Sequence, residues 1–140
     1  MREFVASCVQ IAITPNDVGA NIKKGISWLE KAVREHEAEL VVFPETVTTG
    51  YETNLTPEEL WDLVDEAPGR ITYDIQAAAK NLGVHVVWPT YRRAGERGSV
   101  YNCRTAVGTH NQQSFLRGNP LQFDLILEGD VITVDEHMFI

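Results

Sequence analysis

Hydrophobic and polar positions alternate along the chain in blocks that predict strands and helices in turn. Residues 5–12 alternate in character and contain no Gly or Pro, which is typical of a partly buried strand. After a turn at residues 14–17, the apolar positions between residues 21 and 33 recur at helical spacing and predict an amphipathic helix. The continuous apolar run at residues 40–43 then suits a strand that is buried on both faces.

A short helix and a longer one are predicted next. Thr56 can cap a helix, Pro57 suits its first turn, and Glu59 completes a capping box. Apolar positions between residues 71 and 82 recur at helical spacing, and Gly83 follows where a helix C-cap would lie. The segment before these helices has little periodicity and is expected to be a loop.

Two further strands complete the regular part of the pattern. Residues 84–88 predict a strand that ends at Pro89, and residues 99–107 predict another strand after a polar turn. Because strands and helices alternate along the chain, the pattern predicts an α/β layered fold.

The last part of the chain has a weaker pattern. Residues 109–120 are polar and turn-rich, and two short strands are expected after them, at residues 121–127 and 131–134. The sequence contains no internal repeat, low-complexity tract or interdomain linker. We therefore expect residues 1–140 to belong to a single domain.

The composition is that of a folded protein and narrows the choice of partners. Hydrophobic residues make up 44% and charged residues 23% of the chain, which argues against disorder. The formal net charge of -8 repels nucleic acid and anionic membrane surfaces, so we expect neither as a partner. The first residues do not resemble a signal peptide, and no apolar stretch approaches the roughly 20 residues that span a bilayer. We expect a cytoplasmic protein.

Cysteines and histidines show no metal or disulfide pattern. Cys8 and Cys103 form neither a disulfide framework nor a metal-ligand spacing, and both are expected to be packing residues. None of the histidines is paired at metal-ligand spacing; they are His36, His85, His110 and His137. The sequence also lacks a glycine-rich phosphate loop, so we expect no metal and no cofactor.

Glu45 is the first candidate for chemistry. It follows the apolar run at residues 40–43, and ligands collect at the carboxyl ends of strands in open α/β sheets. A carboxylate beside an apolar strand end would be partly desolvated, which would make it a better general base. A solvated Glu that opens a loop is the alternative, and position alone favours that alternative.

Several short motifs lie in a fixed order along the first 102 residues. Gln10-Ile11-Ala12 ends the first strand, and Asn21 begins the first predicted helix. Phe43-Pro44-Glu45 is followed by Thr49-Gly50-Tyr51, and Tyr101-Asn102 opens a later strand. In order and spacing these motifs resemble the N-terminal portion of the nitrilase superfamily of carbon–nitrogen hydrolases, whereas residues 103–140 diverge.

The resemblance implies hydrolysis of amide, nitrile or N-carbamoyl substrates by a Glu-Lys-Cys triad. The Cys attacks the substrate carbon, the Glu takes the thiol proton and later activates water, and the Lys stabilises developing charge. By this resemblance Glu45 is the general base and Tyr51 lines the substrate pocket, with a core or rim position for Tyr51 equally open. Trp88 and Tyr91 are further candidates near the pocket, although a Trp in a strand is more often a core residue.

The sequence departs from the family pattern after Asn102. No lysine occurs after Lys80, and Arg117 is the only cation in the stretch where the family carries its Lys. Neither cysteine lies in the family's Gly-x-x-x-Cys context. We therefore expect the chain to carry only the Glu of the triad and to be inactive alone.

Three hypotheses remain open about the working protein. The chain is a fragment or disrupted member of the family, or a hydrolase completed by another segment or chain, or a non-enzymatic α/β binding module that kept the fold. The resemblance implies a four-layer αββα sandwich, of which this chain supplies roughly half. Since the other half would cover one sheet face, we expect an exposed apolar surface and a homo-oligomer.

Overall fold

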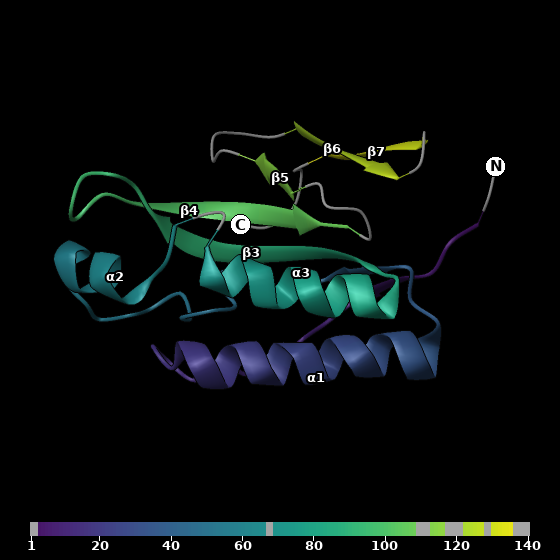
Figure 1. The fold of residues 1–140 in the computed structure, drawn as a ribbon, viewed down its shortest axis with the longest axis horizontal. Helices are drawn as coiled ribbons and strands as arrows, with labels where there is room; N and C mark the ends of the chain where they lie inside the picture. Colours follow the sequence, from purple (N-terminus) through teal and green to yellow (C-terminus); the bar gives the residue numbers. More distant parts are fainter. Residues whose placement is uncertain (1–2, 67–68, 109–112, 117–121, 128–129, 136–140) are drawn as a thin grey trace.

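The computed structural model describes residues 3–66, 69–108, 113–116, 122–127 and 130–135 (Figure 1). The elements run in the order β1 (Ala6–Cys8), α1 (Val18–His36), β2 (Leu40–Val42), α2 (Pro57–Leu63), α3 (Arg70–Leu82), β3 (His85–Arg93), β4 (Val100–Val107), β5 (Gln113–Leu116), β6 (Gln122–Leu127) and β7 (Asp130–Asp135). The predicted alternation of strands and helices is confirmed. None of the helices in the described part of the chain has the length and apolar character that crossing a membrane requires.

Five strands form one mixed sheet, and two form a separate hairpin. The order in the larger sheet is β1-β2-β3-β4-β5, with β1, β2 and β3 parallel to one another. Strand β4 turns back against β3, and β5 against β4, so this end of the sheet is antiparallel. The carboxyl ends of β1, β2 and β3 therefore lie along one edge of the sheet.

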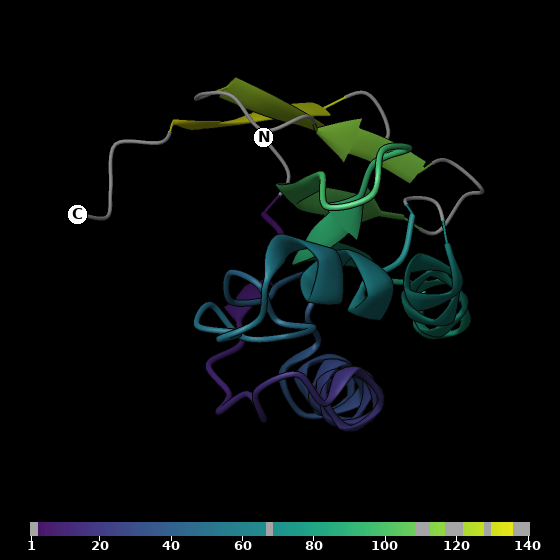
Figure 2. The ribbon, with the colours of Figure 1, turned by 90° about the vertical axis from the view of Figure 1, so that its left-hand side faces the viewer.

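Helices α1 and α3 lie side by side over one face of the sheet (Figures 1 and 2). Asp17 begins α1, because its side chain accepts a hydrogen bond from the Ala20 amide at 3.0 Å. The helix therefore begins at Val18, three residues before the expected start at Asn21. At the C-terminus of α3, Gly83 takes a left-handed conformation and caps the helix as predicted.

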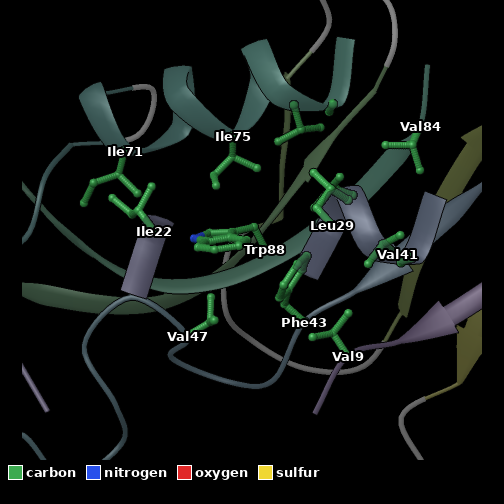
Figure 3. Packing of buried hydrophobic residues seen from close by; sticks show 14 of the residues in the cluster. Val9, Ile22, Leu29, Val41, Phe43, Val47, Ile71, Ile75, Val84 and Trp88 are labelled. Atoms are coloured by element: carbon green, nitrogen blue, oxygen red, sulfur yellow. The ribbon is translucent and has the colours of Figure 1, made fainter. Parts of the chain in front are cut away.

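The main core lies between these helices and the sheet (Figure 3). Trp88 is its largest fully buried side chain, and the ring of Phe43 lies 4.7 Å from the Trp88 ring between centroids. Helix α1 approaches Trp88 at Gly25, where an added Cβ would come within 2.7 Å of the Trp88 Cζ3 atom. The aromatic pair therefore fixes how closely α1 packs on the sheet.

The opposite face of the sheet carries a smaller apolar cluster. Leu40, Val87 and Ala106 pack there with Val42, and the first three are only 6–8% exposed. The expectation that this face presents an exposed apolar surface is therefore wrong for these residues. These three residues lie on the adjacent strands β2, β3 and β4.

Strand β3 continues through Pro89 instead of ending there, which corrects the sequence prediction. The Val87 and Pro89 carbonyls accept hydrogen bonds from the amides of Phe43 and Val47, so both residues direct their backbone groups toward β2 and the loop after it. Pro89 lies beyond Val87, the last residue of β3 that pairs with β2. The N–H that Pro89 lacks would point toward β2 and not toward β4, so its pairing with β4 is undisturbed.

The predicted capping box of α2 is present. The Thr56 hydroxyl accepts from the Glu59 amide at 3.2 Å, and the Glu59 carboxylate accepts from the Thr56 amide at 2.8 Å. Trp61 of this helix donates its indole N–H to the Ala94 carbonyl at 2.8 Å, which ties α2 to the turn between β3 and β4.

Beyond Gly108 the expectations are confirmed in part. Strands β6 and β7 occupy the two short segments where strands were expected. Strand β5, which lies within residues 109–120, was not expected, because that segment lacks a clear apolar alternation. Its pairing is set by β4, an influence that a local pattern does not contain.

Candidate functional site

Glu45 lies just past the carboxyl end of β2, as the sequence predicts. The Phe43 amide donates to the Val87 carbonyl at 3.1 Å, which keeps the chain attached to β3 up to the residue before Pro44. The Glu45 side chain is exposed. The expectation of a partly desolvated carboxylate is therefore wrong within this chain, and the role of Glu45 as general base stays a prediction.

The loop after Glu45 folds into a tight turn. Thr46 has a φ of 50° and its carbonyl accepts from the amides of Thr49 and Gly50, at 3.1 and 2.8 Å. The Val47 amide donates to the Pro89 carbonyl at 3.0 Å, so the turn is also fixed to β3. A left-handed conformation is uncommon for Thr, and these bonds hold it in place.

Thr48 connects this loop to the core beneath it. Its hydroxyl accepts a hydrogen bond from the indole N–H of Trp88 at 3.1 Å and another from the Thr90 hydroxyl at 2.7 Å. Thr48 is fully buried, so both bonds are formed away from water. The loop that carries Glu45 is therefore held by side chains of β3 as well as by backbone.

Asn21 joins the same loop to the start of α1. Its side-chain amide donates to the carbonyls of Thr14 and Thr48, at 2.7 and 3.0 Å, and its oxygen accepts from the Thr14 amide at 2.9 Å. Asn21 is fully buried and forms three of the hydrogen bonds that its amide can form. The motif position noted in the sequence therefore has a structural role beneath the loop.

Asn102 of β4 contacts Glu45 directly. The Asn102 side-chain amide donates to the Glu45 carboxylate, with 2.5 Å between Nδ2 and Oε1. Asn102 pairs with Tyr91 across β3 and β4. Side chains on a strand alternate between its two faces, so Tyr91 lies on the same face as Val87, four residues before it. The pair therefore lies on the sheet face that points away from α1 and α3.

Tyr91 lies near both the Glu45 carboxylate and the Tyr51 phenol. Burial raises the pKa of the Tyr91 phenol, and the charges of Tyr51 and Glu45 raise it further. Tyr91 therefore remains a neutral hydrogen-bond donor beside Glu45 at ordinary pH. Tyr51 itself is 70% exposed, which in this chain favours the rim position over a place in the core.

The structure also places the remaining candidates, which are Trp88 and the two cysteines. Trp88 is 1% exposed and belongs to the core, so the alternative considered for it is confirmed. Cys103 is buried as expected, and burial raises the pKa of its thiol, which disfavours the reactive thiolate. Cys8 is exposed, so its expected packing role is wrong. It lies on β1, an edge strand with only β2 beside it.

The histidines in the described part of the chain lie at the ends of regular elements. His36 ends α1 and His85 begins β3, as the sequence indicates. Across the described ranges, no group of three or more His, Cys, Asp or Glu residues is placed to hold a metal ion. His110, His137 and Arg117 lie outside the described residues.

Glu45 thus follows the carboxyl end of β2, a parallel strand inside an α/β sheet, with its carboxylate held by the Asn102 amide. Ligands collect at the carboxyl ends of strands in such sheets. The carbon-nitrogen hydrolase family model matches residues 5–124. The chain therefore belongs to the carbon–nitrogen hydrolase family, and the resemblance noted in the sequence is confirmed.

The chain is also similar to proteins described as nitrilases. The chain is 31% identical over 116 residues to an aliphatic nitrilase from Sinorhizobium fredii, in a match covering 72% of this chain and 37% of the relative. It is 34% identical over 89 residues to a nitrilase from Pyrococcus abyssi, covering 61% of this chain and 33% of the relative. The chain thus spans about a third of the length of these relatives.

Solved structures share the fold. The carbon–nitrogen hydrolase superfamily protein XC1258 from Xanthomonas campestris superposes with a TM-score of 0.78 at 19% identity, over 95% of this chain and 52% of that protein. An amidase from Nesterenkonia sp. superposes with a TM-score of 0.68 at 17% identity, over 91% of this chain and 53% of that protein. The predicted fold class is confirmed, with this chain matching about half of each neighbour.

Sequence reasoning found Glu45 but missed the groups that hold it. Asn102 was noted only as part of a strand-opening motif, and Thr48 was not singled out. The available signal for Asn102 was its place in the Tyr101-Asn102 motif at the start of a predicted strand. For Thr48 no local signal exists, because its partners Trp88 and Thr90 lie about 40 residues away on another strand.

Proposed function

We propose that Glu45 acts as the general base of a carbon–nitrogen hydrolase that cleaves an amide, nitrile or N-carbamoyl substrate. The observation that carries the proposal is the placement of Glu45 at the end of β2, with its carboxylate held by Asn102, in a chain of this family. A held carboxylate with an accessible oxygen can take a proton from a nucleophile and later from water.

The proposed chemistry needs a nucleophile and a cation as well as the base. A cysteine thiolate would attack the substrate carbon, and a lysine would stabilise the charge that develops there. Neither Cys8 nor Cys103 lies in the family's Gly-x-x-x-Cys context, the Cys103 thiol is also buried, and no lysine follows Lys80 in the sequence. We therefore propose that the Lys and Cys come from outside these 140 residues, and that the chain alone does not turn over substrate.

The proposal is tested by adding the missing groups to the full chain. The chain is mixed with, or fused to, the Lys- and Cys-bearing part of an active family amidase, and ammonia release is measured from simple amides and nitriles. Glu45→Gln is compared with Glu52→Gln, which removes an exposed carboxylate from the same loop. We expect activity only after complementation, and a loss of about 100-fold or more in Glu45→Gln, the range that general bases contribute.

Three outcomes would contradict the proposal. Ammonia release by the chain alone would place the chemistry on other residues. Full activity of the complemented Glu45→Gln variant would remove Glu45 from the base role. Saturable binding of amides without turnover after complementation would instead support the binding-module hypothesis.

A homo-oligomer, which we propose only by analogy with the family, is checked by light scattering on the same samples.

A further inference from the structure

We propose that Asn102 is a positioning residue, which holds the Glu45 carboxylate in one orientation and leaves its second oxygen to accept the proton. The inference rests on the proposed function, in which Glu45 is the base. It assigns to Asn102 a role that the strand-opening motif alone does not indicate.

The hydrogen bond connects β2 and β4, two strands that flank β3 and are far apart in sequence. Glu45 follows β2 and Asn102 lies on β4, 57 residues later, with β3 between them. The bond uses Oε1 of the carboxylate, so Oε2 remains for another partner. Because Asn102 is fixed opposite Tyr91 by the β3–β4 ladder, the position of its amide depends on strand register and not on a flexible loop.

An exposed glutamate needs such a contact to be useful as a base. Its side chain has three rotatable bonds, and fixing such a side chain costs up to about 2 kcal/mol of conformational entropy. A catalytic group displaced by about 1 Å loses on the order of 100-fold in rate. A hydrogen bond from a rigid strand restricts these rotations before substrate binds.

The chemical type of the donor also matters. A side-chain amide donates a hydrogen bond but carries no charge, so it orients the carboxylate without forming an ion pair. Among the described residues, no Lys, Arg or His forms an ion pair with Glu45. Tyr91, the neighbour of Asn102 in the ladder, is likewise neutral, because burial raises the pKa of its phenol.

The test is an NMR experiment on the full chain, which needs no turnover. Side-chain couplings of Glu45 report whether it occupies one rotamer, and the two Asn102 side-chain amide protons report the hydrogen bond. Asn102→Ala is compared with Asn81→Ala, which removes an exposed amide from α3. We expect one Glu45 rotamer in the wild type, averaged couplings in Asn102→Ala, and no change in Asn81→Ala.

A second variant keeps the test decisive if Asn102→Ala does not fold. Glu45→Ala removes the acceptor and leaves Asn102 in place, so we expect the Asn102 amide protons, well separated in the wild type, to shift toward the positions of the exposed Asn81 pair. The proposal is overturned if Glu45 already averages over rotamers in the wild type, or if neither variant changes its partner's signals.

The complemented enzyme separates this proposal from the assignment of Glu45. If positioning is the role of Asn102, Asn102→Ala lowers kcat by about 10- to 100-fold and leaves KM near the wild-type value. A fixed Glu45 in an enzyme that tolerates Glu45→Gln would overturn only the proposed function. An averaged Glu45 in an enzyme that requires Glu45 would overturn only the positioning role.

Discussion

Replacing Thr48 by Val tests how the loop behind Glu45 is held. Val keeps the branched shape of Thr but removes the hydroxyl that accepts from Trp88 at 3.1 Å and from Thr90 at 2.7 Å. Since Thr48 is fully buried, water does not replace the lost acceptor. The loss therefore falls on two donors in the core below the loop.

The change in the free energy of unfolding depends on which acceptors remain for the Trp88 and Thr90 side chains. The Trp88 indole N–H is left without its acceptor in a buried position, which costs about 1–3 kcal/mol. Thr90 loses less, because its single hydroxyl proton can turn to the Tyr91 carbonyl, which lies 3.2 Å from the hydroxyl oxygen. Exchanging a hydroxyl for a methyl group returns about 0.8 kcal/mol through apolar burial. We expect Thr48→Val to lower the free energy of unfolding by about 1–2 kcal/mol.

Urea unfolding followed by Trp fluorescence measures this change, with two control variants. Thr49→Val removes a hydroxyl from an equally buried residue of the same loop, but one that bonds only to the adjacent Gly50 carbonyl at 3.1 Å. Thr48→Ser keeps the acceptor. A Thr48→Val protein as stable as Thr49→Val, or a Thr48→Ser protein as weak as Thr48→Val, would show that the hydroxyl does not anchor the loop.

Two further predictions concern packing and thiol chemistry. Gly25→Ala should lower the free energy of unfolding by about 1 kcal/mol or more, because overpacking against Trp88 outweighs the gain in helix propensity. Gly19→Ala should not destabilise the chain, because its added Cβ would lie 4.0 Å from Asp17 Oδ1, and thermal melts of both variants check the difference. Cys8 should react with a thiol reagent at pH 8, and Cys103 should not. Because burial raises the pKa of the Cys103 thiol, the labelling of Cys103 should increase only as the pH rises further. Equal labelling rates of the two cysteines at pH 8 would contradict this prediction.

Local signals were enough to predict most elements of the fold. The Thr56 capping box and the left-handed Gly83 are formed by residues within four positions of each other, so the sequence contains all the necessary information. Pro89 was misread because its effect depends on which side of β3 lacks a partner. Strand β5 was missed for a similar reason, since its pairing partner is β4.

The site was predictable only as far as the sequence marks single residues. Glu45 could be found because it directly follows an apolar run and belongs to a recognisable motif. Its contact with Asn102 depends on the register in which Asn102 pairs with Tyr91. Register is fixed by the fold as a whole, so spacing along the sequence does not reveal which polar side chains meet.

The exposure of Glu45 indicates from which side the proposed site would be completed. The face of the sheet toward α1 and α3 is filled by the core around Trp88, so no further segment can enter there. Glu45, Asn102 and Tyr91 lie toward the opposite face, beyond the small cluster of Leu40, Val87 and Ala106. A segment carrying the Lys and Cys would therefore have to pack over that face. The desolvation expected of a general base would then come from that packing and not from the end of β2 itself.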